Sequence, residues 1–569
     1  MSPTVEKTLA ERTIEHETYS SIPDGYQSGE TKFVIVTGSV MSGVGKGTFC
    51  GALATLLSCQ GFNVSPIKFD GYLNVDAGTL NPFRHGEVFV LEDGTECDLD
   101  LGSYERALHH NLTKDNYLTG GKIFKIILDK ERAGKYLGRD VQFIPHATGE
   151  IKNYLRELAM KTNADIVLVE VGGTVGDLEN SYFVEAMREL RYEEGRENVM
   201  FFNVTYIVEP GSLNEYKSKA AQIGLRQLMS LGVQPDMIIC RSQTKVPISI
   251  IEKVSVASNV PVERVYNLYD FSDIYEIPLV LRDLGLDNEL FKILNISPKE
   301  NGDDVLNFKN WGNFVEKVKN SNKEVVIGIV GKYTNVHDSY LSILKSLEHA
   351  APYFDAKIKI KWIEATDIED GKITIEEALK DVDGVIVPGG FGKRGIEGKI
   401  VAIKYVRENN IPYLGLCYGM QLAVVEFARN VCGLKDAHTT EVNPATDCPI
   451  IDIIPEQKSK LEKSEMGGTM RLGSFPAKLK EGSLVKNLYG KDVITERHRH
   501  RWELNPEFHK ILEDNGMSLS GVFEERNLVE FIEIPTHKFF LATQAHGEFT
   551  SRPLTPSPLF MGFVQACVK

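Results

Sequence analysis

A single cysteine between two glycines constrains the fold of this chain more than any other feature. Residues 415–421 read GLCYGMQ, directly after the apolar run 411–414 and before a helical pattern that contains Leu422, Val425 and Phe427. A strand, a tight glycine turn and a helix would hold Cys417 on a sharp bend, because glycine adopts conformations that other residues avoid. The N-terminus of a helix also favours the thiolate. The pattern therefore predicts an α/β segment that presents a reactive sulfur.

A nucleophilic cysteine needs a base and a group that orients this base. His546 and Glu548 stand one residue apart near the end of the chain and supply both residue types. The alternative is a buried structural cysteine, which is the usual role of a lone Cys. A glycine-rich loop at residues 388–392 (PGGFG) follows the strand-like run 384–387. Its backbone N–H groups could stabilise a developing oxyanion, although an ordinary turn at the end of a strand fits the same residues.

The bulk properties exclude several classes of protein. A chain of 569 residues with 42% hydrophobic and 25% charged residues predicts two or more globular domains. The net charge of −15 argues against a protein that coats nucleic acid. No apolar run approaches 18 residues, so we expect no membrane span, and the first residues lack the apolar core of a signal peptide. Eight cysteines without a close CxxC pair indicate a reduced, cytoplasmic protein.

Two α/β patterns divide the chain. Residues 1–30 are polar and are predicted to form a flexible tail. Residues 31–296 alternate short β-branched runs with helical stretches, which is typical of a parallel sheet. Residues 297–323 are polar around a short helix near Trp311 and are interpreted as a linker. A second α/β pattern occupies residues 324–569.

A glycine-rich loop opens the first of these patterns. Residues 37–48 (TGSVMSGVGKGT) follow the first strand and lead into a helix. Backbone N–H groups at a helix N-terminus bind phosphate, and Lys46 adds a positive charge. The loop departs from the usual P-loop because Val40 takes the first glycine position and Gly47 the hydroxyl position. Acidic groups at 98–100 and at Glu170 could hold Mg²⁺ beside a phosphate, although each alone also fits a solvated loop.

Together these motifs resemble two known families. The GxCxGxQ pattern with HxE resembles the class I glutamine amidotransferases. Five further stretches resemble the CTP synthase family, in order along about residues 31 to 569: 68–79 (KFDGYLNVDAGT), 85–90 (HGEVFV), 98–106 (DLDLGSYER), 172–177 (GGTVGD) and 497–501 (RHRHR). The resemblance implies a P-loop-like, doubly wound parallel sheet domain followed by a flavodoxin-like amidotransferase domain.

The resemblance also implies a reaction and its residues. An ATP-dependent ligase would phosphorylate the 4-oxygen of UTP and displace this phosphate with ammonia from glutamine, with Mg²⁺ as cofactor. Cys417, His546 and Glu548 would hydrolyse glutamine, held by Gly390, Gln421, Glu441 and Arg501. The residues implied for ATP are Ser42, Gly45, Lys46, Gly47, Thr48, Lys68, Asp100 and Arg241; for UTP or the inhibitor CTP, Ser42, Asp177, Glu179, Lys217, Lys219 and Gln222; for the ammonia passage, His85 and Val88; and for Mg²⁺, Asp100 and Glu170.

Several substrate-facing loops depart from the family pattern. Residues 217–223 (KSKAAQI) keep both lysines and the glutamine but lack the usual proline and histidine. Ala133 stands where a second arginine is common, near a loop tied to activation by GTP. Ser39, Gly43, Gly71, Ala545 and Gly547 also differ from the pattern. Two enzymatic functions therefore remain open: amination of UTP to CTP, or a related amidoligase that acts on another nucleotide or carbonyl compound. A non-enzymatic, filament-forming relative is the third. The family suggests a homotetramer and GTP as an activator. The net charge and the lack of a long apolar run argue against nucleic acid and membrane as partners.

Overall fold

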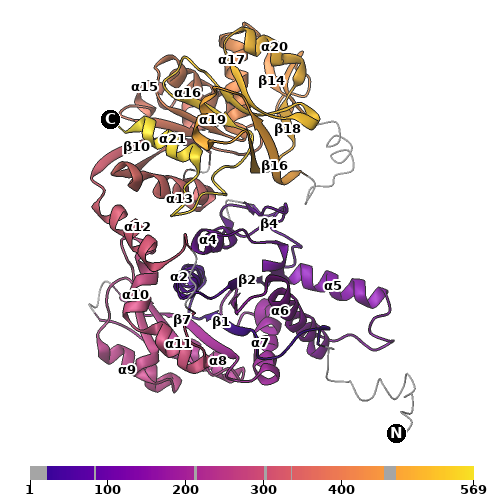
Figure 1. Cartoon of the computed structure of the whole chain (residues 1–569), viewed down its shortest axis with the longest axis vertical. Helices are drawn as coiled ribbons and strands as arrows, with labels where there is room; N and C mark the ends of the chain where they lie inside the picture. The colour runs from indigo at the N-terminus through magenta and orange to yellow at the C-terminus, as the bar shows by residue number, and fades with distance from the viewer. Residues whose placement is uncertain are drawn as a thin grey trace. The chain divides into compact units, whose positions relative to one another are not determined.

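The chain forms two compact units. The computed structural model describes residues 22–81, 85–210, 215–299, 304–332, 334, 336–453 and 470–568 (Figure 1). The first unit contains Met1–Asp76 and Asp115–Asn310, and the second contains Ala77–Lys114 and Trp311–Lys569. Most of the predicted N-terminal tail, residues 1–21, lies outside the described residues, as do residues 300–303 of the predicted linker.

A parallel sheet of seven strands forms the centre of the first unit. All of its neighbouring strands pair in parallel, as the sequence predicts. The strands lie in the order β5 (Tyr117–Thr119), β2 (Val64–Asp70), β6 (Ile166–Val171), β1 (Lys32–Gly38), β7 (Val199–Tyr206), β8 (Met237–Ser242) and β9 (Val265–Tyr269).

Helices cover both faces of this sheet. Successive residues of a strand point to opposite faces, and both faces of these strands are buried. Phe202 of β7 meets Phe49 of α2 (Lys46–Cys59), with ring centroids 5.1 Å apart. On the other face Phe69 of β2 stacks on Phe183 of α7 (Ser181–Glu194) at 4.7 Å. The doubly wound arrangement is therefore confirmed. The other α-helices of the unit are α5 (Gly120–Arg132), α6 (Thr148–Thr162), α8 (Lys219–Ser230), α9 (Ile248–Ser258), α10 (Ile277–Asp283) and α11 (Leu286–Leu294) (Figure 1).

The second unit contains a sheet of nine strands, of which the first five are parallel. Their order corresponds to the 2-1-3-4-5 order of a flavodoxin-like fold, which the resemblance implied. These strands are β11 (Ala356–Glu364), β10 (Lys323–Gly331), β12 (Gly384–Val387), β13 (Tyr413–Leu416) and β21 (Phe540–Thr543). One core packs α16 (Ile396–Glu408) and α17 (Tyr418–Asn430) against the sheet, and another packs α13 (Leu341–Ala350) and α21 (Pro558–Cys567).

Four antiparallel strands extend this sheet beyond β21. They follow in the order β20 (Leu528–Glu533), β19 (Ser518–Phe523), β16 (Arg471–Leu479) and β17 (Val493–His500). The sequence analysis did not predict this extension. In the resulting sheet β17 is an edge strand, which pairs with β16 on one side only.

The segment Ala77–Lys114 packs with the second unit, although the sequence analysis placed it within the amidoligase domain at 31–296. It contains the short antiparallel strands β3 (Phe89–Val90) and β4 (Glu96–Cys97) and the helix α4 (Leu99–Leu108). Phe89 is fully buried and its ring lies 4.8 Å from that of Phe549. Burial of this apolar surface explains the difference. We call Ala77–Lys114 the insert below. The predicted linker also contains a longer helix than expected, α12 (Phe308–Asn320), which buries Trp311.

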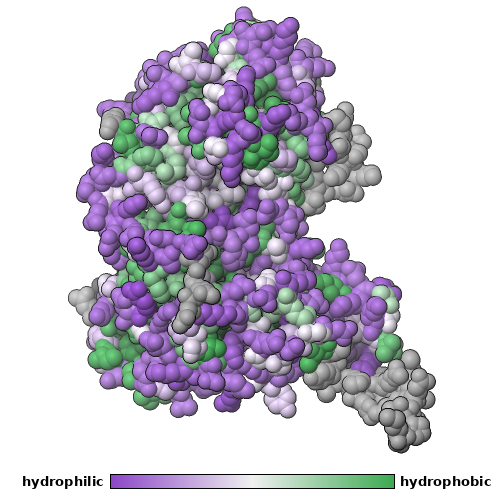
Figure 2. Space-filling model, viewed as in Figure 1, coloured by the Kyte–Doolittle hydropathy of each residue, from purple (hydrophilic) through white to green (hydrophobic). Residues whose placement is uncertain are grey.

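Hydrophilic residues dominate the visible face of the molecule (Figure 2). In the part of the chain that the structure describes, no helix is both long and apolar enough to cross a membrane.

Candidate functional site

Cys417 sits at the junction of β13 and α17 with an unusual backbone conformation. Its φ of 51° and ψ of −100° are rare for a residue with a side chain, and such strain costs of order 1–3 kcal/mol. The flanking glycines make the bend possible. A Cβ atom on Gly419 would lie 2.1 Å from the carbonyl oxygen of Val387, and one on Gly415 would lie 2.8 Å from the Cβ of Ala542. The predicted sharp bend is therefore present, and its glycines cannot be replaced without movement.

Two neighbouring groups contact the sulfur of Cys417. The carbonyl oxygen of Arg499 lies 3.9 Å from Sγ, within reach of a thiol proton. The side-chain Nε2 of Gln544 donates to Sγ at 3.7 Å. The hydrogen bond from this amide fixes the position of the sulfur. The sequence analysis missed Gln544, although its place two residues before His546 at the end of β21 is a usable signal.

His546 and Glu548 lie beside Cys417. Nδ1 of His546 is 2.7 Å from Oε1 of Glu548. Burial alone would lower the pKa of His546, but the Glu548 carboxylate and the Cys417 sulfur outweigh it and raise the pKa to about 10. A Cβ atom on Gly389 would lie 3.0 Å from Cε1 of His546 and 3.6 Å from the Cβ of Cys417, so one glycine borders both residues. The structure thus brings the three predicted residues together.

A cavity of about 540 Å³ opens over these residues, entirely within the second unit. Gly389 and Gly390 of the predicted oxyanion loop line it, together with Glu441 and Arg501, two of the residues expected to hold glutamine. Val88 lines the same cavity from the insert, whereas His85 is exposed. The size and the mixed charges suit a small zwitterionic substrate.

Side chains that the sequence analysis did not associate with the loop fix its backbone. Glu441 accepts a hydrogen bond from the backbone N–H of Gly392 at 2.7 Å. Lys332 donates to the carbonyl oxygen of Phe391. The Tyr418 hydroxyl donates to the carbonyl oxygen of Gly392 at 3.5 Å. Burial raises the pKa of Glu441, although the Gly392 N–H and Lys332 oppose the shift. Lys332 directly follows β10 at the carboxyl edge of the sheet, where sites of such folds form, and this place could have predicted it.

The side chain of Gln421, also expected to hold glutamine, does not line this cavity. Its Nε2 donates to the carbonyl oxygen of Trp502 at 2.8 Å and to Oε1 of Gln544 at 3.2 Å. These bonds orient Gln544 beneath the sulfur. Contact between Gln421 and a substrate stays a prediction.

Glu87 of the insert is a cavity residue that the sequence analysis quoted only within a motif. Burial raises the pKa of its carboxyl group to about 7, with hydrogen bonds from Ser342 opposing the shift and the charge of Glu548 adding to it. An acidic residue two positions after His85 in an otherwise apolar strand start was the available signal.

The glycine-rich loop at residues 37–48, called the phosphate loop below, has backbone geometry suited to binding an anion. Gly43 and Gly45 have φ values of 71° and 94°, and α2 starts at Lys46. Val40 has a φ of 79°, which is strained for a β-branched residue and explains why glycine is usual there. Nζ of Lys46 donates to the carbonyl oxygen of Gly173 at 2.7 Å, which holds the ammonium group beside the loop.

The structure also places the other residues predicted for nucleotides. Arg241 pairs with Asp270 at 2.7 Å, and its Nε would lie 3.2 Å from a Cβ atom on Gly45, so it borders the phosphate loop. Asp177 accepts a hydrogen bond from the N–H of Thr174 at 2.7 Å and lines a cavity of about 210 Å³. Gly47 is buried in the first turn of α2. Six further residues are exposed or partly exposed, and their contacts with a nucleotide stay predictions: Ser42, Thr48, Glu179, Lys217, Lys219 and Gln222.

The two predicted magnesium ligands belong to different units. Glu170 lies on β6 of the first unit, is buried, and stands 4.0 Å from Nζ of Lys68. Asp100 lies in the first turn of α4, in the second unit. Among the described residues no three His, Cys, Asp or Glu side chains form a cluster suited to a metal. Mg²⁺ is commonly held by one or two carboxylates and the substrate phosphates, so a site of the predicted kind needs no such cluster.

Comparisons with known proteins decide the family. The model described as "CTP synthase N-terminus" matches residues 32–296, and "Glutamine amidotransferase class-I" matches residues 335–566. The CTP synthase of Thermococcus gammatolerans is 49% identical over 537 residues, which cover 94% of this chain and 98% of that protein. The chain belongs to the CTP synthase family. Another CTP synthase, from Pyrococcus horikoshii, is 50% identical over the same shares of both chains.

One departure from the CTP synthase pattern has a structural explanation. The Ser39 hydroxyl is buried and lies 2.9 Å from both Oδ1 of Asn203 and Oγ1 of Thr205. Its Cβ occupies space that is free only because residue 224 is glycine, since a Cβ on Gly224 would lie 2.6 Å away. Ser39 is thus accommodated by its surroundings and leaves the phosphate loop intact.

Proposed function

We propose that this chain aminates UTP to CTP, with ATP and with ammonia released from glutamine. Its membership of the CTP synthase family over nearly the full length supports this reaction, and nothing in the comparisons favours a different acceptor. The observation that carries the glutaminase half is the single cavity that contains Cys417, His546 and Glu548. The non-enzymatic alternative does not account for this arrangement.

In the glutaminase half, Cys417 would attack the side-chain amide carbon of glutamine. His546, held by Glu548, would give its proton to the departing nitrogen, so that the C–N bond breaks, ammonia leaves and a thioester forms. The N–H groups of the loop at 388–392 would stabilise the tetrahedral oxyanion. Water, deprotonated by His546, then releases glutamate. Opposite charges suit Arg501 to the α-carboxylate of glutamine and Glu441 to its α-amino group, with Gly390 beside them.

In the synthase half, Lys46 and Lys68 would stabilise the phosphoryl group as it passes from ATP to the 4-oxygen of UTP. Phosphate is then displaced from C4 by ammonia. Glu170 and Asp100 would hold Mg²⁺, which supplies charge neutralisation between the phosphates. The other residues that we assign are Ser42, Gly45, Gly47, Thr48 and Arg241 to ATP, Ser42, Asp177, Glu179, Lys217, Lys219 and Gln222 to UTP or CTP, Gln421 to glutamine, and His85 and Val88 to the ammonia passage.

Three finer features belong to the same proposal. We expect a homotetramer and activation by GTP, as the family resemblance suggests, and a cytoplasmic location. The structure shows no disulfide among the described residues, which suits a reducing compartment.

The decisive experiment incubates the purified chain with UTP, MgATP and glutamine and follows CTP and glutamate. We expect both products in the wild type. Cys417→Ala should abolish CTP formation from glutamine and leave formation from ammonium salts within about twofold, because only the nitrogen supply uses the thiol. Glutamate release without CTP would instead support the alternative acceptor. Loss of both nitrogen sources in Cys417→Ala would contradict the two-site scheme.

A further inference from the structure

The edge strand β17 carries two arginines whose side chains point to the insert. Arg497 and Arg499 are two residues apart, so their side chains leave the same face of the strand. Nη1 of Arg497 lies 2.8 Å from Oε2 of Glu105, and Nη2 lies 3.1 Å from Oε1. Nε of Arg499 lies 2.8 Å from Oε1 of Glu96. Two carboxylates of the insert therefore hold two successive positions on one face of β17.

The backbone of the same two arginines contacts both catalytic residues. The carbonyl oxygen of Arg497 accepts a hydrogen bond from the backbone N–H of His546 at 2.8 Å. The carbonyl oxygen of Arg499 lies 3.9 Å from Sγ of Cys417. The side of β17 that does not pair with β16 is thus a support for the nucleophile and its base.

Arg499 also reaches the oxyanion loop. Its guanidinium carbon lies 5.5 Å from the centre of the Phe391 ring, a cation–π distance, and Arg499 itself lines the cavity. Glu96 binds Nε of the same guanidinium group. A shift of Arg499 would consequently disturb the loop at 388–392 as well as the sulfur.

The opposite face of β17 is held by a second set of polar contacts. His498 lies 3.4 Å from Glu530, and His500 lies 3.6 Å from Glu503. Arg471 joins both carboxylates at 2.7 and 2.9 Å. Contacts within the second unit's sheet thus hold one face of β17. On the other face, the carboxylates of the insert hold the strand next to the catalytic residues.

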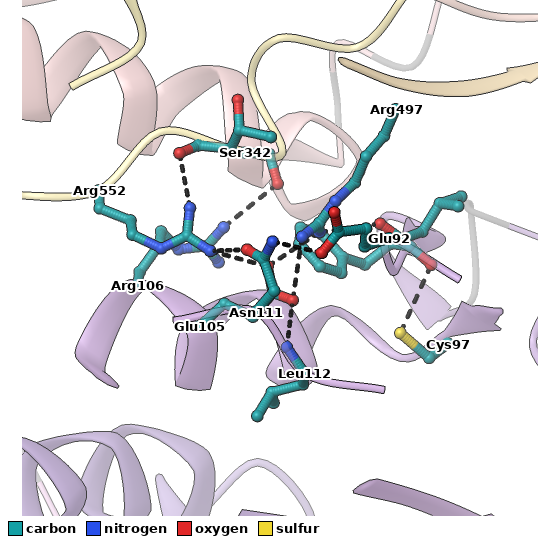
Figure 3. A network of polar contacts seen from close by, with 12 residues as sticks. Glu92, Cys97, Glu105, Arg106, Asn111, Leu112, Ser342, Arg497 and Arg552 are labelled. Atoms are coloured by element: carbon teal, nitrogen blue, oxygen red, sulfur yellow. Dashed lines mark hydrogen bonds and ion pairs between the residues drawn. The ribbon is translucent and has the colours of Figure 1, made fainter. Parts of the chain in front are cut away.

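Glu105 is the centre of the contacts on the insert side (Figure 3). It is fully buried and accepts from Arg497, from the N–H of Leu112 at 2.8 Å and from Arg552 at 3.3 Å. Such pairing offsets the cost of burying the Glu105 carboxylate. In Figure 3 the side chain of Arg497, from β17, points toward Glu105 on α4. Glu96 pairs with Arg499, and among the described residues no group forms a hydrogen bond with its buried Oε2.

We propose that Glu96 and Glu105 are positioning residues of the glutaminase centre: the insert holds β17 through Arg499 and Arg497, and β17 holds Cys417 and His546. Neither carboxylate touches the reacting atoms. This proposal rests on the proposed glutaminase function and adds a requirement to it, namely that residues 324–569 alone do not complete the active site. The insert leaves the first unit after Asp76 and returns at Asp115, so any displacement of the insert would act on glutamine hydrolysis.

Glu96→Gln is the sharpest test, because it removes one charge, keeps the shape and leaves the more densely bonded Glu105 in place. Glu92→Gln is the matched control: it makes the same change four residues earlier in the same hairpin, at an exposed side chain that contacts Asn111 rather than β17. In the full-length chain we expect Glu96→Gln to lower kcat for glutamine hydrolysis at least tenfold, more than it raises KM. CTP formation from ammonium should stay within twofold, which would show that the variant remains folded.

A second measurement separates positioning from general damage. The rate of Cys417 alkylation by iodoacetamide, taken as the difference from Cys417→Ser, should change its pH profile in Glu96→Gln and not in Glu92→Gln. Glu96→Asp, which keeps the charge, should recover part of kcat. Wild-type hydrolysis in Glu96→Gln, or an equal loss of the glutamine and ammonium reactions, would overturn this proposal alone. A wild-type chain that releases no glutamate would overturn the proposed function and this proposal with it.

Discussion

One hydrogen bond of 2.7 Å joins Nδ1 of His546 to Oε1 of Glu548, and both side chains are buried. The bond fixes the ring and keeps its proton, since the pKa of His546 is raised to about 10 although burial alone would lower it. At neutral pH the buried imidazolium can therefore stabilise a thiolate at Cys417.

Glu548→Gln should remove that stabilisation. Without the carboxylate, burial lowers the pKa of His546, so the imidazolium is lost as the pH rises and the thiolate becomes costlier. We expect glutamine hydrolysis at pH 7 to fall at least tenfold. Alkylation of Cys417 followed from pH 6 to 10 measures the change, because the wild-type imidazolium persists to about pH 10. An unchanged alkylation profile would remove Glu548 from this role.

Glu87→Gln should reduce the loss of stability that the wild type shows between pH 5 and pH 8. The pKa of Glu87 is raised in the folded state to about 7, so folding holds its proton. Glu87 therefore contributes fully to the free energy of unfolding below its unfolded pKa of about 4.5. This contribution, about 3 kcal/mol, is lost as the pH rises through the folded pKa of about 7. Melting temperatures of both proteins at pH 5 and pH 8 measure it. Exposed Glu92→Gln is the control, and equal pH dependence in wild type and Glu87→Gln would contradict the prediction.

Lys46→Ala should suppress CTP formation from glutamine and from ammonium alike. Both reactions need the phosphorylated nucleotide, and the ammonium group of Lys46 is held beside the phosphate loop by the carbonyl oxygen of Gly173. We expect a loss of at least a hundredfold, with basal glutamine hydrolysis within about twofold. Lys253→Ala, at an exposed position of α9, is the control. Near-normal synthesis from ammonium would exclude Lys46 from the phosphoryl transfer.

Gly224→Ala should destabilise the first unit, and Ser39→Gly should relieve part of the damage. The new Cβ would lie 2.6 Å from the Cβ of Ser39, and overpacking of this kind costs about 1–3 kcal/mol. In the double mutant the clash is gone, so we expect a favourable coupling of about 1 kcal/mol. Denaturant unfolding of the four proteins measures it. Gly312→Ala, where a new Cβ meets nothing within 4 Å, should not destabilise. Strict additivity would show that the two positions do not compete for space.

The sequence predicted those parts of the site that depend on neighbours along the chain. Cys417 between glycines after an apolar run has one local solution, a strand that turns sharply into a helix, and α17 starts at the next residue. Lys46 after a glycine-rich loop is another such case. The two α/β patterns were equally readable, because parallel strands and helices have different periods of apolar residues.

The tertiary structure alone decided which distant segments share a unit. Glu105 and Arg497 are separated by 392 positions, and a carboxylate in a helical pattern looks the same whether water or an arginine faces it. The insert interrupts the first α/β pattern without a change in composition, so its packing with the second unit was not predictable. Local sequence fixes backbone geometry through sterics and hydrogen bonds between near neighbours. A buried charge is stable only where its partners offset the cost of its desolvation. Those partners come together only when the whole chain is folded, so the local sequence does not identify them.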